Sequence, residues 1–161
     1  MGLPVYQRTT VRADLSDLPA DVAATLRDHA ESTQLTVTDD LPAWITRSIN
    51  PPSTTFFGKL FGRRSNPVDP DSEHQTLIVL HPTHLIVVVS GAERGVSALS
   101  CPLAVASMSS TPYVPESDGF SVTGFAGHEG RPGSFYLGTG EPAGTECREA
   151  VRSAIVAAKN P

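Results

Sequence analysis

Cysteine is scarce in this chain, which has only Cys101 and Cys147 among its 161 residues. Neither stands in a Cys-x-x-Cys pattern or in a Cys/His pattern with zinc-ligand spacing, so the sequence offers no zinc signature. We expect both to be buried thiols that pack like small apolar side chains. A disulfide between them stays open as the alternative, although a cytoplasmic setting disfavours it.

The chain also lacks a long apolar run. Its most apolar stretch, residues 77–89, is interrupted by His-Pro-Thr-His and is shorter than the roughly 20 residues that cross a bilayer. The first residues include Pro4, Gln7 and Arg8, which break the uninterrupted apolar core that a signal peptide needs. We therefore expect a cytoplasmic protein without a transmembrane helix.

Positive charge is in deficit, because 12 Lys and Arg stand against 17 Asp and Glu for a net charge of −5. This balance excludes a surface built throughout to neutralise phosphates, so we expect no nucleic-acid partner. The bases are unevenly spread, however. Residues 41–70 hold four bases and one acid, whereas the segments before and after them are acidic. The acidic chain thus contains one basic island.

What the chain does contain fits a single loop-rich globular domain, with 39% hydrophobic residues, 13 Gly and 14 Pro. Two amphipathic helices are expected. Apolar residues at four-residue spacing after Ser16 and Asp17, which can cap a helix, predict a helix over about 18–32. A second helix is predicted over 142–159, where six residues share one apolar face: Cys147, Ala150, Val151, Ala154, Ile155 and Ala158.

Between the helices, β-branched runs predict an antiparallel β protein. Residues 76–80 and 85–89 flank a tight turn and predict a hairpin that is buried on both faces or nearly so. Trp44, the only tryptophan, is expected to anchor the core. The predicted strands are 43–49, 74–81, 84–90, 95–101, 103–109, 119–125 and 134–138.

The order of these elements resembles that of bacterial pleckstrin-homology-like domains. The turn from Leu80 to Ile86 looks like the second hairpin of that family, which often reads Leu-Thr-x-x-Arg-Leu-Ile, with His81 and His84 where Thr and Arg are usual. A strand ending in Pro-Leu at 102–103 and the Tyr-Leu-Gly run at 136–138 are also similar.

The resemblance covers about 43–159 and implies an α+β, mainly β fold. Its core would be a seven-stranded antiparallel split barrel capped by the C-terminal helix. Residues 1–42 would then be an N-terminal helical extension, and residues 43–161 the domain itself. Members of this group are as a rule non-catalytic, and some bind lipid or protein.

No set of residues in the chain predicts catalysis or metal binding, so we expect no enzyme, no cofactor and no metal. Cys147 belongs to the apolar face of its helix, unlike an activated nucleophile. His81 and His84 end a four-residue turn, where exposed or capping imidazoles are a simpler interpretation than metal ligands. The carboxylate pairs Asp39/Asp40 and Asp69/Asp71 stand in turns and are explained by capping.

The basic island contains the candidate binding site, which we call the aromatic-basic segment, residues 56–64. It reads Phe-Phe-Gly-Lys-Leu-Phe-Gly-Arg-Arg within a long loop between the first two predicted strands. Its candidate contact residues are Phe56, Phe57, Lys59, Leu60, Phe61, Arg63 and Arg64.

We expect a non-catalytic binding or scaffold module that contacts a partner protein through the aromatic-basic segment. The alternative is peripheral binding to anionic membrane lipid through the same residues, because apolar rings can enter an interface while cations meet headgroups. In lipid-binding pleckstrin-homology domains the loop at this position often supplies the phosphate ligands. Aromatics packed back onto the domain, with solvated cations, would leave the segment without a binding role.

Overall fold

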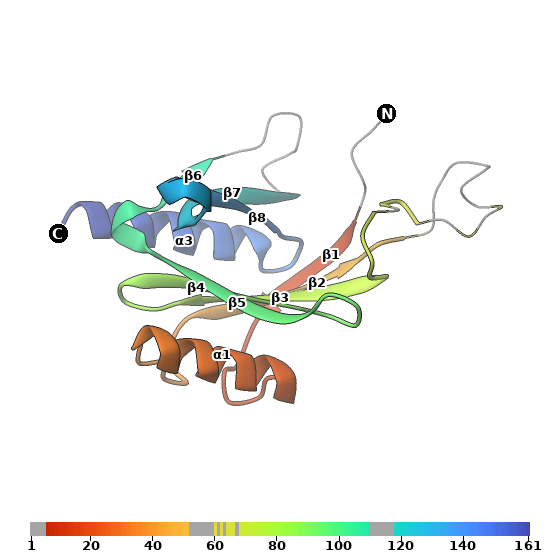
Figure 1. The fold of residues 1–161 in the computed structure, drawn as a ribbon, viewed down its shortest axis with the longest axis horizontal. Helices are drawn as coiled ribbons and strands as arrows, with labels where there is room; N and C mark the ends of the chain where they lie inside the picture. The colour runs from red at the N-terminus through yellow and green to blue at the C-terminus, as the bar shows by residue number, and fades with distance from the viewer. Residues whose placement is uncertain (1–5, 52–59, 61, 63, 67, 110–117) are drawn as a thin grey trace.

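A computed structural model of the chain describes residues 6–51, 60, 62, 64–66, 68–109 and 118–161. Over these residues the protein is α+β and mainly β, with two antiparallel sheets and two α-helices, as predicted (Figure 1). No helix in these ranges is both long and apolar enough to cross a membrane. Cys101 and Cys147 are buried and free, as expected.

The larger sheet has five strands in the order β1-β2-β3-β4-β5, and every neighbouring pair is antiparallel. The strands are β1 (Gln7–Arg12), β2 (Ala43–Ile49), β3 (Glu73–Leu80), β4 (His84–Gly91) and β5 (Gly95–Pro102). The smaller sheet has the order β6-β7-β8. It consists of β6 (Ser107–Ser109), β7 (Gly119–Ala126) and β8 (Pro132–Gly138).

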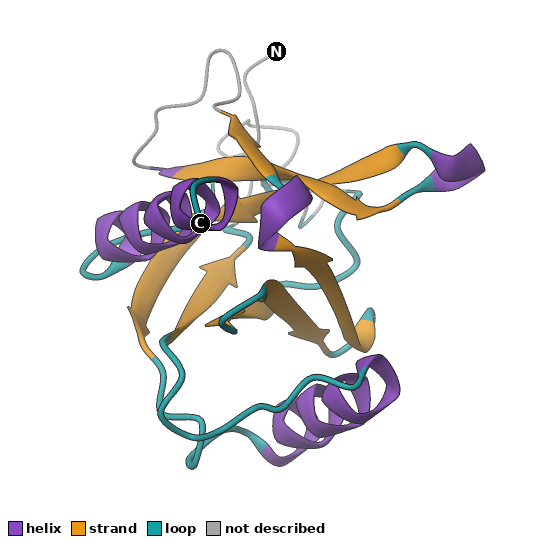
Figure 2. Cartoon of the chain, turned by 90° about the vertical axis from the view of Figure 1, so that its left-hand side faces the viewer, coloured by secondary structure: helices purple, strands orange, loops and turns teal. Residues whose placement is uncertain are grey.

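The two helices lie on opposite sides of the five-stranded sheet, α1 (Ala20–Thr33) below it and α3 (Gly144–Lys159) above it in the views of Figures 1 and 2. The three-stranded sheet lies on the α3 side. The five-stranded sheet is therefore the middle layer, and both of its faces need apolar side chains.

Two hydrophobic cores result from this layering. The first lies between the five-stranded sheet, the three-stranded sheet and α3, and contains Trp44, Phe120 and Val151. The second lies under α1, where Leu26 packs in one cluster with Ile86 and other residues of the sheet. Strands β3 and β4 contribute alternate residues to the two cores, which confirms the prediction that this hairpin is buried on both faces. Trp44 is 1% exposed, so the predicted core anchor is confirmed.

Strand β1 was not predicted. Only Thr10 is buried in it, and Val11 is 41% exposed, so its sequence shows no apolar alternation. It nevertheless pairs with β2 over its whole length. Residues 1–42 thus contribute an edge strand as well as a helix, which the predicted helical extension did not include.

Two predicted boundaries were also wrong. The strand expected at 103–109 begins as a 3-10 helix (Leu103–Val105), where buried Leu103 and Ala106 turn the chain before β6. The last helix starts at Gly144, two residues later than predicted. Just before the helix, the Thr10 N–H donates to the backbone oxygen of Glu141 at 3.2 Å, and the Ala143 N–H donates to the backbone oxygen of Thr10 at 2.9 Å. These bonds hold residues 141–143 beside β1, and the helix begins at the next residue.

Candidate functional site

The aromatic-basic segment joins β2 to β3, as predicted, and the structure describes two of its seven candidate contact residues. Leu60 is 64% exposed. Arg64 donates a hydrogen bond to the backbone oxygen of Asn50 at 3.3 Å. The other five lie outside the described residues: Phe56, Phe57, Lys59, Phe61 and Arg63. What the structure does show in detail is the chain just before and just after the loop that contains the segment.

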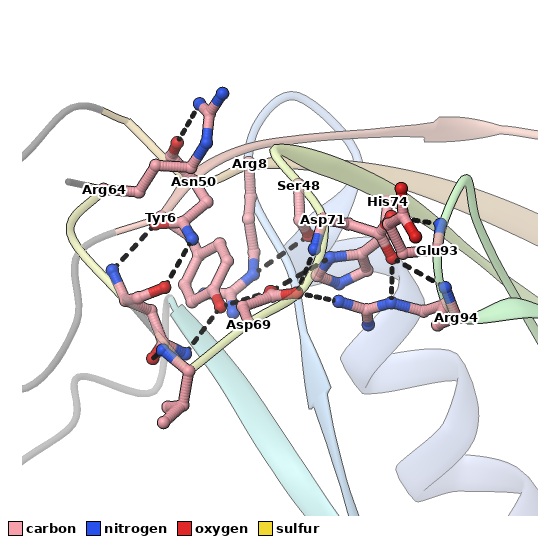
Figure 3. A network of polar contacts seen from close by, with 12 residues as sticks. Tyr6, Arg8, Ser48, Asn50, Arg64, Asp69, Asp71, His74, Glu93 and Arg94 are labelled. Atoms are coloured by element: carbon pink, nitrogen blue, oxygen red, sulfur yellow. Dashed lines mark hydrogen bonds and ion pairs between the residues drawn. The ribbon is translucent and has the colours of Figure 1, made fainter. Parts of the chain in front are cut away.

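Two asparagines, one before the segment and one after it, join the chain at the base of the loop (Figure 3). Asn50, 1% exposed, donates from Nδ2 to the backbone oxygen of Asn66 and accepts from the Asn66 N–H at Oδ1, both at 2.8 Å. The Ser65 N–H donates to the backbone oxygen of Pro51 at 2.7 Å. This pairing satisfies polar groups that burial would otherwise destabilise. The chain on each side of the segment is therefore held at a fixed separation.

The hydrogen bonds continue from these asparagines to the residue before β1. Asn66 Nδ2 donates to the Tyr6 hydroxyl at 2.9 Å, and that hydroxyl donates to Asp69 Oδ2 at 2.6 Å. A hydroxyl that both accepts and donates in this way strengthens each bond it makes. We call the set Tyr6, Asn50, Asn66, Asp69, Asp71, His74 and Arg94 the polar frame.

Asp71 and Arg94 tie the polar frame to the turn between β4 and β5. Asp71 is 2% exposed and accepts the Glu93 N–H at 2.7 Å and Arg94 Nε at 2.7 Å. Arg94 also forms an ion pair with Asp69. A Cβ atom at Gly91 would overlap the Asp71 carboxylate, so glycine leaves the space in which this carboxylate lies. The hydrogen bond from Glu93, opposed by burial and aided by Arg94, lowers the pKa of Asp71.

His74 contributes an aromatic and titratable group to the polar frame. Its ring meets that of Tyr6 edge to face at a centroid distance of 5.9 Å, and its Nδ1 lies 3.9 Å from Asp69 Oδ2. This Nδ1 is buried, and no described group hydrogen-bonds to it. Burial and the nearby Arg94 charge lower the pKa of His74, against the attraction of Asp69. Burial works to raise the pKa of Asp69, but hydrogen bonds from Tyr6, Asp71 and Arg94 outweigh it, so that pKa is lowered.

These shifts predict a fold that loses stability in acid. The lowered pKa of His74 means that the folded chain takes up this proton at a lower pH than the unfolded chain, whose His74 protonates near its ordinary pKa of 6.5, so the unfolded state binds more protons as the pH falls below that value. Asp69 and Asp71, whose pKa values are lowered by folding, cause a second loss of stability as the pH falls below their ordinary pKa of 3.8. We expect the midpoint of thermal unfolding, followed by circular dichroism, to fall in two pH windows, one below pH 6.5 and one below pH 3.8.

The variant His74→Gln separates the two windows. In this variant the loss of stability below pH 6.5 should be smaller, and the loss below pH 3.8 should be unchanged. Part of the first loss should remain, because burial also lowers the pKa values of His29 and His84. If the variant lost as much stability below pH 6.5 as the wild-type protein, His74 would have no part in that loss.

Arg8 joins three strands beside the polar frame. Its guanidinium lies 4.7 Å from the centroid of the Tyr6 ring and 5.9 Å from that of Tyr136, and its Nε donates to Ser48 Oγ at 3.3 Å. Among the described residues it forms no ion pair, and burial lowers its pKa. Stacking on tyrosine rings stabilises a cation of this kind, so Arg8 links β1 to β2 and β8.

The histidines of the β3–β4 turn have local roles. The Thr83 N–H donates to His81 Nδ1 at 3.1 Å, and the Thr83 hydroxyl lies 2.8 Å from His84 Nδ1. The rings of His81 and His84 meet edge to face at 6.0 Å. No group of three or more His, Cys, Asp or Glu side chains that could hold a metal ion occurs in the described part of the chain.

Sequence reasoning found one part of the site and missed another. Asp69 accepts the Asp71 N–H at 3.0 Å, which confirms the predicted turn capping. The ion pairs of both carboxylates with Arg94 were not predicted, because Arg94 is distant in sequence and only the fold brings it near. Tyr6, Asn50 and Asn66 were also missed. The two asparagines that bracket the aromatic-basic segment were the one available signal, since asparagine commonly bonds to nearby backbone.

The chain was compared with protein-family models, with curated proteins and with solved structures. None of the three comparisons found a match. Function is therefore inferred from the chain's own residues: a polar frame at the base of a loop whose sequence is rich in aromatic and basic residues.

Proposed function

We propose that this protein is a non-catalytic binding module that contacts a partner protein through the aromatic-basic segment. We also propose that its fold is pleckstrin-homology-like, with β1 and α1 added to the family's plan. Two antiparallel sheets and a C-terminal helix that share one core support this assignment. The two free thiols are consistent with the proposed cytoplasmic location.

The observation that carries the proposal is the polar frame, which holds together the chain that enters and leaves the loop containing the segment. Many connecting loops leave their backbone groups to water, whereas the base of this loop is held by buried polar side chains. Here Asn50 and Asp71 are 1% and 2% exposed and fully engaged in hydrogen bonds. Fixed loop ends reduce the entropy that the loop loses when it binds. The frame is thus what a binding loop requires.

The composition of the segment indicates the kind of partner. Aromatic residues and arginine are enriched where protein interfaces bind most strongly, and the segment holds three Phe and two Arg among nine residues. Leu60, at 64% exposure, offers an apolar side chain to solvent. Because the basic island lies in a chain of net charge −5, we propose an acidic surface on the partner.

Catalysis by a cysteine nucleophile is disfavoured by the state of the two thiols. Cys101 and Cys147 are both 0% exposed. Burial raises the pKa of Cys101 to about 11 and that of Cys147 to about 12. A thiol with such a pKa, out of contact with solvent, is a poor nucleophile at neutral pH.

Site-specific photo-cross-linking tests the proposal. A benzoylphenylalanine in place of Leu60 should form an adduct of one discrete mass with a protein in the native cells. The same residue in place of Val105, which is also 64% exposed but lies on the 3-10 helix, is the matched control and should not form that adduct.

Charge reversal shows whether the adduct depends on the segment. Lys59→Glu with Arg63→Glu should remove it, whereas Arg27→Glu with Arg131→Glu, which changes the net charge equally elsewhere, should preserve it. Arg64 is left intact because it bonds to Asn50. Co-sedimentation with phosphatidylglycerol vesicles tests the membrane alternative. Vesicle binding that the first pair abolishes, without a protein adduct, would replace the proposal by that alternative.

A further inference from the structure

The two edges of the five-stranded sheet differ in how they are protected. Strand β1 forms one edge, carries Arg8 and Arg12, and is covered at Thr10 by backbone hydrogen bonds to residues 141–143. Strand β5 (Gly95–Pro102) forms the other edge, in front in Figure 1, and contains no charged residue. Proteins usually blunt an open edge with charged side chains, a bulge or a covering segment. The β5 edge is therefore the one that is suited to pair with another strand.

The hydrogen-bond pattern of the sheet shows which backbone groups of β5 point outward. At the β3–β4 turn the His81 N–H donates to the backbone oxygen of His84 at 2.9 Å. Antiparallel strands bond to their two neighbours through alternate residues, so the even-numbered residues of β4 bond to β3 and the odd-numbered ones to β5. The residues of β5 that face those odd-numbered ones are Cys101, Leu99 and Ser97. The residues between them direct their backbone groups to the open edge: Val96, Ala98 and Ser100.

The side chains along this edge are small and uncharged. Ser97 is exposed, whereas the residues on either side of it are partly buried. Val96 and Ala98 pack against the core under α1, and Leu99 packs against the core on the other face of the sheet. No described residue forms a backbone hydrogen bond to Val96, Ala98 or Ser100 from the open side. The edge thus offers paired-strand geometry with unused backbone donors and acceptors.

The β5 edge is separate from the aromatic-basic segment and the polar frame. Tyr6 precedes β1, and the Arg8 guanidinium of β1 lies over the Tyr136 ring. The Tyr136 hydroxyl in turn donates to the backbone oxygen of Asp118 at 3.0 Å. These residues therefore lie at the β1 edge, and four strand spacings of about 4.8 Å separate β1 from β5 along the sheet, which is about 19 Å.

We propose that β5 pairs with β5 of a second copy of this chain, antiparallel and about a twofold axis, so that the two five-stranded sheets become one continuous sheet. With Ala98 opposite Ala98 of the second copy, Val96 lies opposite Ser100, and each outward residue exchanges both of its backbone hydrogen bonds. No charged residue lies opposite another, which would destabilise the pair. A slip of two residues would place an outward residue opposite Arg94 of the turn or opposite Pro102, which has no N–H.

Sedimentation equilibrium over a range of protein concentrations tests the pairing. We expect the average mass to rise from that of one chain toward that of two. Ala98→Pro removes the central outward N–H and leaves the bonds to β4 intact, because proline is tolerated where a strand N–H faces solvent. It should weaken dimerisation at least about tenfold, since the bonds at the twofold axis are lost from both copies.

A second variant keeps the test decisive if the proline unfolds the strand. Ser97→Lys places at an exposed position of the edge the residue that commonly guards such edges, and it should also weaken dimerisation about tenfold. Val156→Lys is the matched control, because it adds the same charge at a 55% exposed position of α3. It should change dimerisation less than about twofold.

Cysteine cross-linking tests the register. In the proposed pair the two residues at position 98 face each other with Cα atoms about 5.5 Å apart, which a disulfide can bridge. Ala98→Cys should therefore form a covalent dimer on oxidation. Val96→Cys should cross-link with Ser100→Cys in a mixture but not with itself, because four residues offset its two copies by about 13 Å. The native Cys101 and Cys147 are 0% exposed and should not react.

The mass of one chain at every concentration would overturn the proposal and assign the edge, if it is used, to a strand of a different protein. A dimer that Ala98→Pro and Ser97→Lys both leave unchanged would also overturn it, because the two copies would then associate through another surface. Cross-linking of Val96→Cys with itself and not with Ser100→Cys would contradict the antiparallel register.

Discussion

Replacing Val151 by aspartate is expected to lower the free energy of unfolding by about 3–5 kcal/mol, because it places an unpaired charge in a dry core. Val151 is 0% exposed on α3 and packs in the core that includes Trp44 and Phe120. Domains of this size are stable by only about 5–15 kcal/mol. Urea denaturation followed by Trp44 fluorescence should therefore show a midpoint that falls by a large part of its value.

Val156→Asp is the matched control, with the same change five residues later on the same helix. Val156 is 55% exposed, and surface substitutions of this kind usually change stability by less than about 0.5 kcal/mol. Equal stability losses in the two variants would contradict the burial of the Val151 face of α3, and with it the core between the helix and the two sheets.

Leu26→Ala is expected to lower the free energy of unfolding by about 2–5 kcal/mol, the usual range when a buried leucine is truncated and leaves a cavity. Leu26 is 5% exposed on α1 and belongs to the second core with Ile86 and Val88. The loss should come with an unchanged dependence of unfolding on urea concentration, since the same surface is exposed on unfolding. This variant tests whether α1 is part of the cooperative fold.

Leu60→Ala provides the comparison, because Leu60 is 64% exposed and its truncation should change stability by less than about 0.5 kcal/mol. If Leu26→Ala were as mild as Leu60→Ala, α1 would be an accessory helix and not the cover of a second core. The two variants make the same chemical change, so the difference between their stability losses reports the difference in burial between Leu26 and Leu60.

Much of the fold could be predicted from local pattern. The β3–β4 hairpin and α3 carry strong periodic signals, because each buries its apolar residues in a regular order. Strand β1 carries none, since it lies at a sheet edge and only Thr10 points into a buried position. Its place is set by pairing with β2 and by backbone bonds to residues 141–143, which are contacts between distant parts of the chain.

The candidate site was predictable only in part for the same reason. The aromatic-basic segment can be recognised in the sequence from its unusual composition alone. The polar frame is not visible in this way, because Tyr6, Asp69 and Arg94 come from three distant parts of the chain and meet only after folding.

The measurement that tests the central claim most directly is photo-cross-linking in native cells from a benzoylphenylalanine at position 60. We predict one protein adduct of constant mass, absent when the probe stands at position 105 and lost when Lys59 and Arg63 are both replaced by Glu. No adduct at position 60, or an adduct that survives the charge reversal, would contradict the claim that the aromatic-basic segment is a protein-binding site.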